Sequence, residues 1–242
     1  ISIIIASLMV FSFGCAKKEE KEIKIGAVMP LTGDGAVYGD PQRKAAELAV
    51  TEINEKGGLI GRKVVLAPQD DKKQPTEAAN IAHMFNSSKD IVGVIGHPNS
   101  GTAKAASPIY NEKNMPFVIT SATNPDITKQ GFKNVFRFAP TDDMQGISAA
   151  NFIFDSLKTN SIVILHDNDA YGKGLADQVK QRFVSLGGKV LLFEAIAVGE
   201  NDYRSILSKA KKLKPAIIFY GGMHPEAAKL LKQAKEIALN TK

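Results

Sequence analysis

The 242-residue sequence contains one cysteine and no tryptophan, and its aromatic content is only 7%. A single cysteine cannot form a disulfide within the chain, so disulfides do not hold this fold together. The only long apolar run is residues 1–14 (ISIIIASLMVFSFG), and a helix of that length is too short for a ~30 Å hydrocarbon core. The sequence therefore excludes a polytopic membrane protein. Its 44% hydrophobic content likewise excludes a disordered chain.

The sequence also lacks a large excess or a cluster of charge of one sign. The 31 Lys and Arg residues exceed the 25 Asp and Glu residues by six, and the two signs alternate along the chain without a basic block. Proteins that follow a phosphate backbone concentrate their Lys and Arg on one surface or segment. We therefore expect no nucleic-acid partner.

The motifs of common catalytic and metal sites are absent from the sequence. It has no Walker A loop, no G-x-S-x-G elbow and no H-E-x-x-H or Cys/His ligand spacing. The four histidines are far apart, and we expect each to be structural: His83, His97, His166 and His224. Asp70 and Asp71 form an adjacent acid pair, but aspartates at a strand end more commonly cap loops. We expect no enzyme activity, no cofactor and no metal.

One glycine-rich loop requires comparison with a dinucleotide site. Residues 33–39 (GDGAVYG) follow an apolar run, but their G-x-G-x-x-x-G spacing is one residue too long for the fingerprint. Asp34 and Asp40 also place negative charge where a pyrophosphate would bind. This loop therefore does not predict nucleotide binding.

The N-terminus is typical of an export signal. Residues 1–14 have the length of a signal-peptide apolar region, and Cys15 follows directly. A lone cysteine between such a region and a charged tether (residues 15–21) resembles a bacterial lipobox, which predicts lipid attachment at Cys15. Ser12 stands where a lipobox usually has an aliphatic residue, so secretion with cleavage near Gly14 is the alternative. Both readings predict an exported protein.

From Glu22 onward, strand-like and helix-like segments alternate. The predicted strands are short Val- and Ile-rich runs, apolar on both faces as in buried parallel sheets, at 23–29, 63–68, 91–96, 116–121, 161–166, 190–197 and 216–221. The predicted helices have apolar residues at helical spacing and cover 42–56, 76–86, 101–113, 143–157, 172–186, 202–213 and 225–238. This alternation predicts an α/β protein with parallel, doubly wound sheets.

The cycle restarts after residues 131–142, which predicts two Rossmann-like lobes at 22–138 and 139–242. Each lobe opens with a strand, a loop and a Tyr-Gly pair, Tyr38-Gly39 in the first and Tyr171-Gly172 in the second. Ligands bind at the carboxyl ends of strands in open α/β sheets. The repeated tyrosine at this position therefore predicts a ligand cleft between the lobes.

Small polar residues follow two neighbouring strands of the first lobe. Ser100 comes after IVGVIG, and Ser121 and Thr123 come after PFVIT. Hydroxyls and free N–H groups at a helix N-terminus form a carboxylate site, although Ser100 and Thr123 taken alone are equally consistent with helix capping. Together with Tyr38 and Tyr171 they favour a small anionic ligand with an apolar or ammonium group against the aromatic rings.

Five ordered stretches resemble the branched-chain amino-acid binding proteins of ABC importers, which have the type I periplasmic-binding-protein fold. They are the stretch from IKIGAVMPLTGDGAVYGD to LIGRKV, the aspartate pair at 70–71, IVGVIGHPNSGTAKAASPIYNEKNMPFVITSATNP, HDNDAYGKGLADQVKQ and IIFYGGMHPEAAKLLKQA. The resemblance implies that the chain captures leucine, isoleucine or valine and delivers it to ABC permease subunits. It also implies a monomer that touches the membrane only through its lipid anchor.

Carried over by residue, the resemblance implies that Ser100, Ser121, Ala122 and Thr123 hold the ligand carboxylate and ammonium, partly through backbone groups. Tyr38 and Tyr171 would close over the ligand from opposite lobes, beside Met223. Two departures concern specificity. Met223 stands where leucine-type members commonly have an aromatic residue, and the loop containing Ser121 is shorter than in some relatives.

The resemblance further implies that the ammonium-pairing acid lies beyond Lys242 and that a C-terminal part of the fold is missing from this sequence. Two alternatives stay open. A sensor or receptor domain of the same fold binds a small molecule without transport, and importer receptors of this family also take amides, urea or aromatic acids.

Overall fold

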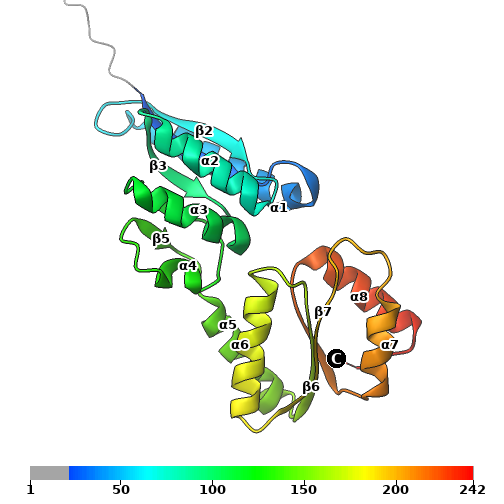
Figure 1. The fold of residues 1–242 in the computed structure, drawn as a ribbon. Helices are drawn as coiled ribbons and strands as arrows, with labels where there is room; N and C mark the ends of the chain where they lie inside the picture. The colour runs from blue at the N-terminus through cyan, green and yellow to red at the C-terminus, as the bar shows by residue number, and fades with distance from the viewer. Residues whose placement is uncertain (1–21, 242) are drawn as a thin grey trace, which may run out of the picture.

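The computed structural model describes residues 22–241 and arranges them as two α/β lobes in chain order (Figure 1). The predicted signal (1–14), Cys15 and the tether (15–21) lie outside the described residues. Within the described range, no helix is both long and apolar enough to cross a membrane. The doubly wound α/β architecture with two Rossmann-like lobes is confirmed.

The first lobe is built on a five-stranded parallel sheet of order β2-β1-β3-β4-β5. Its strands are β1 (Ile23–Met29), β2 (Val64–Asp70), β3 (Ile91–Gly96), β4 (Phe117–Ile119) and β5 (Val135–Arg137). The order reverses between β1 and β3, and a switch of this kind opens a crevice at the carboxyl ends of the strands. The loops that follow β1, β3 and β4 therefore meet at one edge of the sheet.

Four helices accompany this sheet: α1 (Ala36–Glu55), α2 (Pro75–Ser87), α3 (Ser100–Glu112) and the short α4 (Asp126–Lys129). Helices α2 and α3 pack together and bury the main core, in which Phe85, Tyr110 and Phe117 are almost fully enclosed. Helix α1 lies against β1 and β2 and buries only Gly39 completely. The main core of the first lobe therefore lies between the sheet and helices α2 and α3.

The second lobe repeats the opening of the first. Its parallel strands β6 (Ser161–His166), β7 (Lys189–Ala195) and β8 (Ile217–Gly221) have the order β7-β6-β8, matching β2-β1-β3. Its helices are α5 (Asp142–Asn151), which continues as a π-helical turn at Phe152–Ser156, α6 (Gly172–Ser185), α7 (Arg204–Lys212) and α8 (His224–Glu236). Separate apolar clusters fill the space under α5 and α6 and under α7 and α8. The sheet is thus covered on both faces (Figure 1).

Several predicted bounds differ from the structure by one or a few residues, and the largest difference is at the start of the first helix. The first helix begins at Ala36 rather than at Gln42, directly after a 3₁₀ turn at Gly33–Gly35. Pro41 therefore lies inside the helix, where its missing N–H costs the helix one backbone hydrogen bond. The consequence is that Tyr38 projects from the first turn of a helix and not from a loop.

Candidate ligand-binding site

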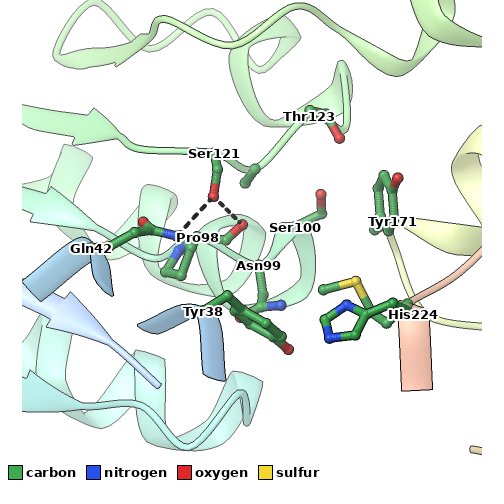
Figure 2. Close-up of a pocket in the computed structure, with 11 residues that line it drawn as sticks. Tyr38, Gln42, Pro98, Asn99, Ser100, Ser121, Thr123, Tyr171 and His224 are labelled. Atoms are coloured by element: carbon green, nitrogen blue, oxygen red, sulfur yellow. Dashed lines mark hydrogen bonds between the residues drawn. The ribbon is translucent and has the colours of Figure 1, made fainter. Parts of the chain in front are cut away.

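A pocket of about 310 Å³ lies between the lobes at the carboxyl ends of their strands. It brings together all seven residues predicted to bind a ligand: Tyr38, Ser100, Ser121, Ala122, Thr123, Tyr171 and Met223. Four further residues line it that the sequence did not single out as ligand contacts: Gln42, Pro98, Asn99 and His224. Figure 2 shows both tyrosines and the polar residues around this space. That these residues contact a ligand stays a prediction.

Three residues of the first lobe, Ser100, Ser121 and Thr123, form what we call the polar wall. Strands β3 and β4 are paired, with Gly96 opposite Ile119, so the loops that follow them lie side by side. The Ser121 hydroxyl donates to the Pro98 carbonyl at 3.3 Å and accepts from the Gln42 amide at 3.4 Å (Figure 2). These bonds fix a hydroxyl at the pocket surface.

Ser100 does not cap its helix. It is the first residue of α3, and the N-cap residue Asn99 makes no side-chain cap bond. The Ser100 hydroxyl instead accepts from the Asn124 N–H at 3.3 Å, which links the two polar loops. The N–H groups of a first helical turn have no partner within the helix, and the helix dipole is positive there. The start of α3 thus offers donors to an anionic group in the pocket.

A buried side-chain network supports the same loop. His97 has a φ of 43°, a conformation that few non-glycine residues adopt, and it directly precedes Pro98. Its ring is fully buried, with Nδ1 3.0 Å from a carboxylate oxygen of Asp71 and Nε2 3.1 Å from the Tyr110 hydroxyl. These contacts hold the strained backbone in place, so the pocket loop is positioned by the core of the first lobe.

Asp70 has a capping role, as the sequence predicted. Its carboxylate accepts from the N–H groups of Leu31 at 2.7 Å and Lys72 at 2.9 Å, and from the Thr32 hydroxyl. These hydrogen bonds lower the pKa of Asp70 although its partial burial opposes them. The Asp70 and Asp71 carboxylates therefore tie loops together at the strand ends.

The geometry explains the repeated Tyr-Gly pair. A Cβ on Gly39 would lie 1.8 Å from the Pro30 carbonyl oxygen, and one on Gly172 would lie 2.4 Å from the Gly221 carbonyl oxygen. Both glycines therefore allow the first turn of a helix to touch the backbone at the end of a strand. This close approach brings Tyr38 and Tyr171, one residue earlier, to the pocket.

Three residues of the second lobe, Tyr171, Met223 and His224, form what we call the side-chain wall. Burial raises the pKa of the Tyr171 phenol, and the nearby Asp142 and Asp167 carboxylates raise it further. Met223 and His224 begin α8 at the end of β8. The His224 ring meets the Tyr38 ring edge-on, with centroids 6.2 Å apart, so a second-lobe residue reaches the first lobe across the pocket.

The expectation of four structural histidines holds for two of them. His97 is enclosed as described, and the buried His166 accepts from the Asn168 N–H at 3.1 Å. His83 is exposed on α2, and His224 lies in the pocket. His224 and His97 both lie near a strand end, so their sequence positions do not distinguish them. The orientation of the loop decides whether the side chain enters the core or the pocket.

Two of the additional lining residues carry unpartnered acceptors. The Oδ1 atom of Asn99 and the Oε1 atom of Gln42 are buried and have no hydrogen-bond partner among residues 22–241. The sequence could have identified both Asn99 and Gln42 as residues near the site. Asn99 immediately precedes Ser100, and Gln42 lies four residues after Tyr38 on the same helix, hence on the same face.

The lining contains no Asp, Glu, Lys or Arg side chain. It combines hydroxyls, amides and a helix N-terminus on one side with aromatic rings and a thioether on the other. No group of three or more potential metal ligands occurs in the described part of the chain. The arrangement suits non-covalent binding of a small molecule with one charged and one apolar end.

The chain is similar to proteins of one family. A family profile described as "Periplasmic binding protein" matches residues 22–242. The chain is 38% identical over 218 residues to Leu/Ile/Val-binding protein homolog 1 of Brucella abortus, covering 90% of this chain and 58% of that protein. It is 35% identical over 242 residues to a leucine-, isoleucine-, valine-, threonine- and alanine-binding protein of Pseudomonas aeruginosa, covering 65% of it. The chain thus spans about 60% of the length of these relatives.

Solved structures agree with this match. The leucine-binding protein LivK of Thermotoga maritima has a TM-score of 0.84 and 30% identity, and the match covers 90% of this chain and 61% of that one. LivJ of Streptococcus pneumoniae, solved in complex with isoleucine, has a TM-score of 0.82 and 28% identity, with 91% and 63% covered.

Proposed function

Because the chain belongs to the periplasmic binding protein family, we propose that it is the substrate-binding component of an ABC importer for branched-chain amino acids. One observation carries the proposal. Residues from both lobes converge on a single pocket of about 310 Å³, with the polar wall on one side and the side-chain wall on the other. This volume is at the lower end of the range for small-molecule sites and suits a ligand of amino-acid size.

The relatives support an aliphatic amino acid as the ligand. The Brucella, Pseudomonas and Thermotoga proteins are named for binding leucine, and the Streptococcus structure contains isoleucine. The pocket of this chain offers a place for each part of such a molecule. The ligand carboxylate would accept from the first turn of α3 and from the Ser100 hydroxyl, and the Ser121 and Thr123 hydroxyl oxygens would accept from the ammonium.

The aliphatic side chain of the ligand would lie among Tyr38, Tyr171 and Met223. Aromatic rings and a flexible thioether provide apolar contact without demanding one shape, which is consistent with accepting leucine, isoleucine and valine. Met223 gives more freedom than an aromatic residue would at the same place.

Capture would proceed by closure of the lobes. Within the described residues the chain passes from one lobe to the other once, between β5 and α5. The Asn124 amide also donates to the Ala170 carbonyl at 2.7 Å across the lobes. A short connection of this kind allows hinge motion, and the closed form would dock on the permease.

Export and anchoring complete the proposal. The apolar residues 1–14 and the cysteine that follows support secretion with lipid attachment at Cys15, which would hold the protein at the membrane near its permease. Binding without turnover is the activity we propose for this chain.

A thermal-shift panel on the full-length protein tests the proposal, with the twenty amino acids, acetamide, urea and benzoate as ligands. A ligand at 100 times its Kd stabilises the native state by about 2.7 kcal/mol, which is several degrees in Tm for a protein of this size. We expect shifts with leucine, isoleucine and valine. A shift only with benzoate or an amide would keep the family and overturn the ligand. A cooperative transition that no ligand moves would contradict amino-acid capture.

A further inference from the structure

One acid next to the polar wall is buried and incompletely paired. Asp142 is the first residue of α5, and its side chain is fully enclosed. Its Oδ1 atom accepts from the Gln145 amide at 3.4 Å, but no donor in the described residues makes a hydrogen bond to Oδ2. A buried carboxylate in this state is costly unless another positive group compensates it.

The surroundings of Asp142 link it to the pocket. Its N–H donates to the Thr123 carbonyl at 3.0 Å, and the Thr123 hydroxyl lies close enough to lower the pKa of the carboxyl. Its charge also raises the pKa of Tyr171, a pocket residue of the same lobe. Asp142 is therefore bonded to one residue that lines the pocket and acts electrostatically on a second.

Arg137 acts on the charge of Asp142 but forms no salt bridge with it in the described part of the chain. The Arg137 guanidinium attracts the Asp142 charge, yet it donates to the Asn124 carbonyl at 2.7 Å and to the Thr128 hydroxyl at 2.6 Å. Burial is the largest influence on the Asp142 carboxyl and raises its pKa. When ionised, Asp142 therefore places a negative charge behind Thr123 that no salt bridge of the described residues balances.

We propose that Asp142 is a positioning residue that makes the pocket selective for ligands with an ammonium group, acting through Thr123. A Thr123 hydroxyl that donates toward Asp142 leaves its oxygen lone pairs free to accept from the ligand ammonium. The buried negative charge then favours a cationic group at that point and disfavours a neutral one. This inference rests on the proposed function, because it assigns the ammonium end of the ligand to Thr123.

The alternative is that Asp142 only stabilises its own helix. An aspartate in the first turn of a helix interacts favourably with the helix dipole whatever lies in the pocket. Asp143 occupies the next position of the same turn, is partly exposed and pairs with Lys129 at 3.3 Å. The substitution Asp143→Asn is therefore a matched control, because it removes one charge from the same helix terminus at a residue that has no contact with Thr123.

The test compares leucine with its hydroxy acid analogue, in which a neutral hydroxyl replaces the ammonium. Affinities of the full-length protein, Asp142→Asn and Asp143→Asn for both ligands are measured by calorimetry, after thermal unfolding shows that each variant is folded. We expect Asp142→Asn to weaken leucine about 10- to 100-fold and to leave the hydroxy acid within about threefold, as for loss of one buried charge near a cation. Asp143→Asn should leave the ratio of the two affinities unchanged.

Equal weakening of both ligands by Asp142→Asn, or no weakening of leucine, would overturn the inference. A wild-type protein that binds neither ligand would overturn the proposed function itself, so the two failures are distinct. If Asp142→Asn does not fold, the wild-type protein still decides. Leucine should lower the pKa of Asp142, followed through the chemical shift of its carboxyl carbon, and the hydroxy acid should not. The same pKa in both complexes would overturn the inference.

Discussion

The two lobes share a topology but present different chemistry to the pocket. The first lobe places Ser100, Ser121 and Thr123 at the ends of β3 and β4, and Asp142 of the second-lobe helix α5 bonds the Thr123 backbone. The second lobe places Tyr171, Met223 and His224 at the ends of β6 and β8. The difference suggests a division of labour: the polar wall binds what all amino acids share, and the side-chain wall responds to what distinguishes them.

The largest effect is expected from disabling the polar wall. Ser100→Ala combined with Thr123→Val removes two hydroxyls that would bond charged groups of the ligand, at about 2 kcal/mol each. Leucine, isoleucine and valine should all weaken by roughly 1000-fold in calorimetric titrations, because the lost contacts are common to the three. Retention of leucine affinity within tenfold in the folded variant would contradict the role of this wall.

The next largest effect is expected at the close contact between α6 and β8, which positions the side-chain wall. Gly172→Ala places a Cβ 2.4 Å from the Gly221 carbonyl oxygen and 2.2 Å from an oxygen of Asp167. Asp167 follows β6 and Gly221 ends β8, so neither can move without disturbing a strand end, and we expect the free energy of unfolding to fall by about 2–3 kcal/mol.

Gly93→Ala is the matched control for that variant, since its Cβ would meet its nearest neighbour at an ordinary 3.5 Å. Chemical denaturation should show a change within about 0.5 kcal/mol for Gly93→Ala. Equal losses in the two variants would show that the approach of α6 to β8 is not the constraint.

A smaller effect is expected from the paired tyrosines. Tyr171→Ala removes a half-buried ring from the pocket, and leucine affinity should fall about tenfold, a loss of about 1.5 kcal/mol. Tyr171→Phe keeps the ring and should bind leucine within about twofold of wild type. If calorimetry instead gives Tyr171→Phe the larger loss, the phenol and not the ring is the binding group.

The smallest effect separates the two walls most cleanly. Met223→Leu conserves volume and should change unfolding free energy by less than about 1.5 kcal/mol. Its binding readout is the order of affinities: the preference among leucine, isoleucine and valine should shift by a few fold, because Met223 contacts the variable part of the ligand. An equal change for all three ligands would place Met223 against the common part and break the division of labour.

Most of the fold was accessible from the sequence because each lobe uses apolar strands buried on both faces. The strands at 23–29, 91–96 and 161–166 were predicted with their observed bounds. The start of α1 was not, because Pro41 weakens the helical pattern although the helix passes through it. Close packing of Gly39 on Pro30 is a tertiary contact, and it outweighs this local signal.

The site residues also divide into those that the sequence predicted and those that it missed. Ser100, Thr123 and both tyrosines were predicted because they follow strands whose carboxyl ends must meet. His224 and His97 each follow a strand, yet one lies in the pocket and the other bonds Asp71 and Tyr110 in the core. No local pattern separates them. Asp142 was also missed, because its importance depends on burial behind Thr123 and not on spacing.

The most direct test of the central claim is a calorimetric titration of the full-length protein with L-leucine and with leucinamide, which keeps the side chain and ammonium but lacks the carboxylate. The account predicts one-site binding of leucine and at least 100-fold weaker binding of leucinamide, since the first turn of α3 and the polar wall would lose their anionic partner. Equal affinity for the two ligands, or no binding of leucine, would contradict it.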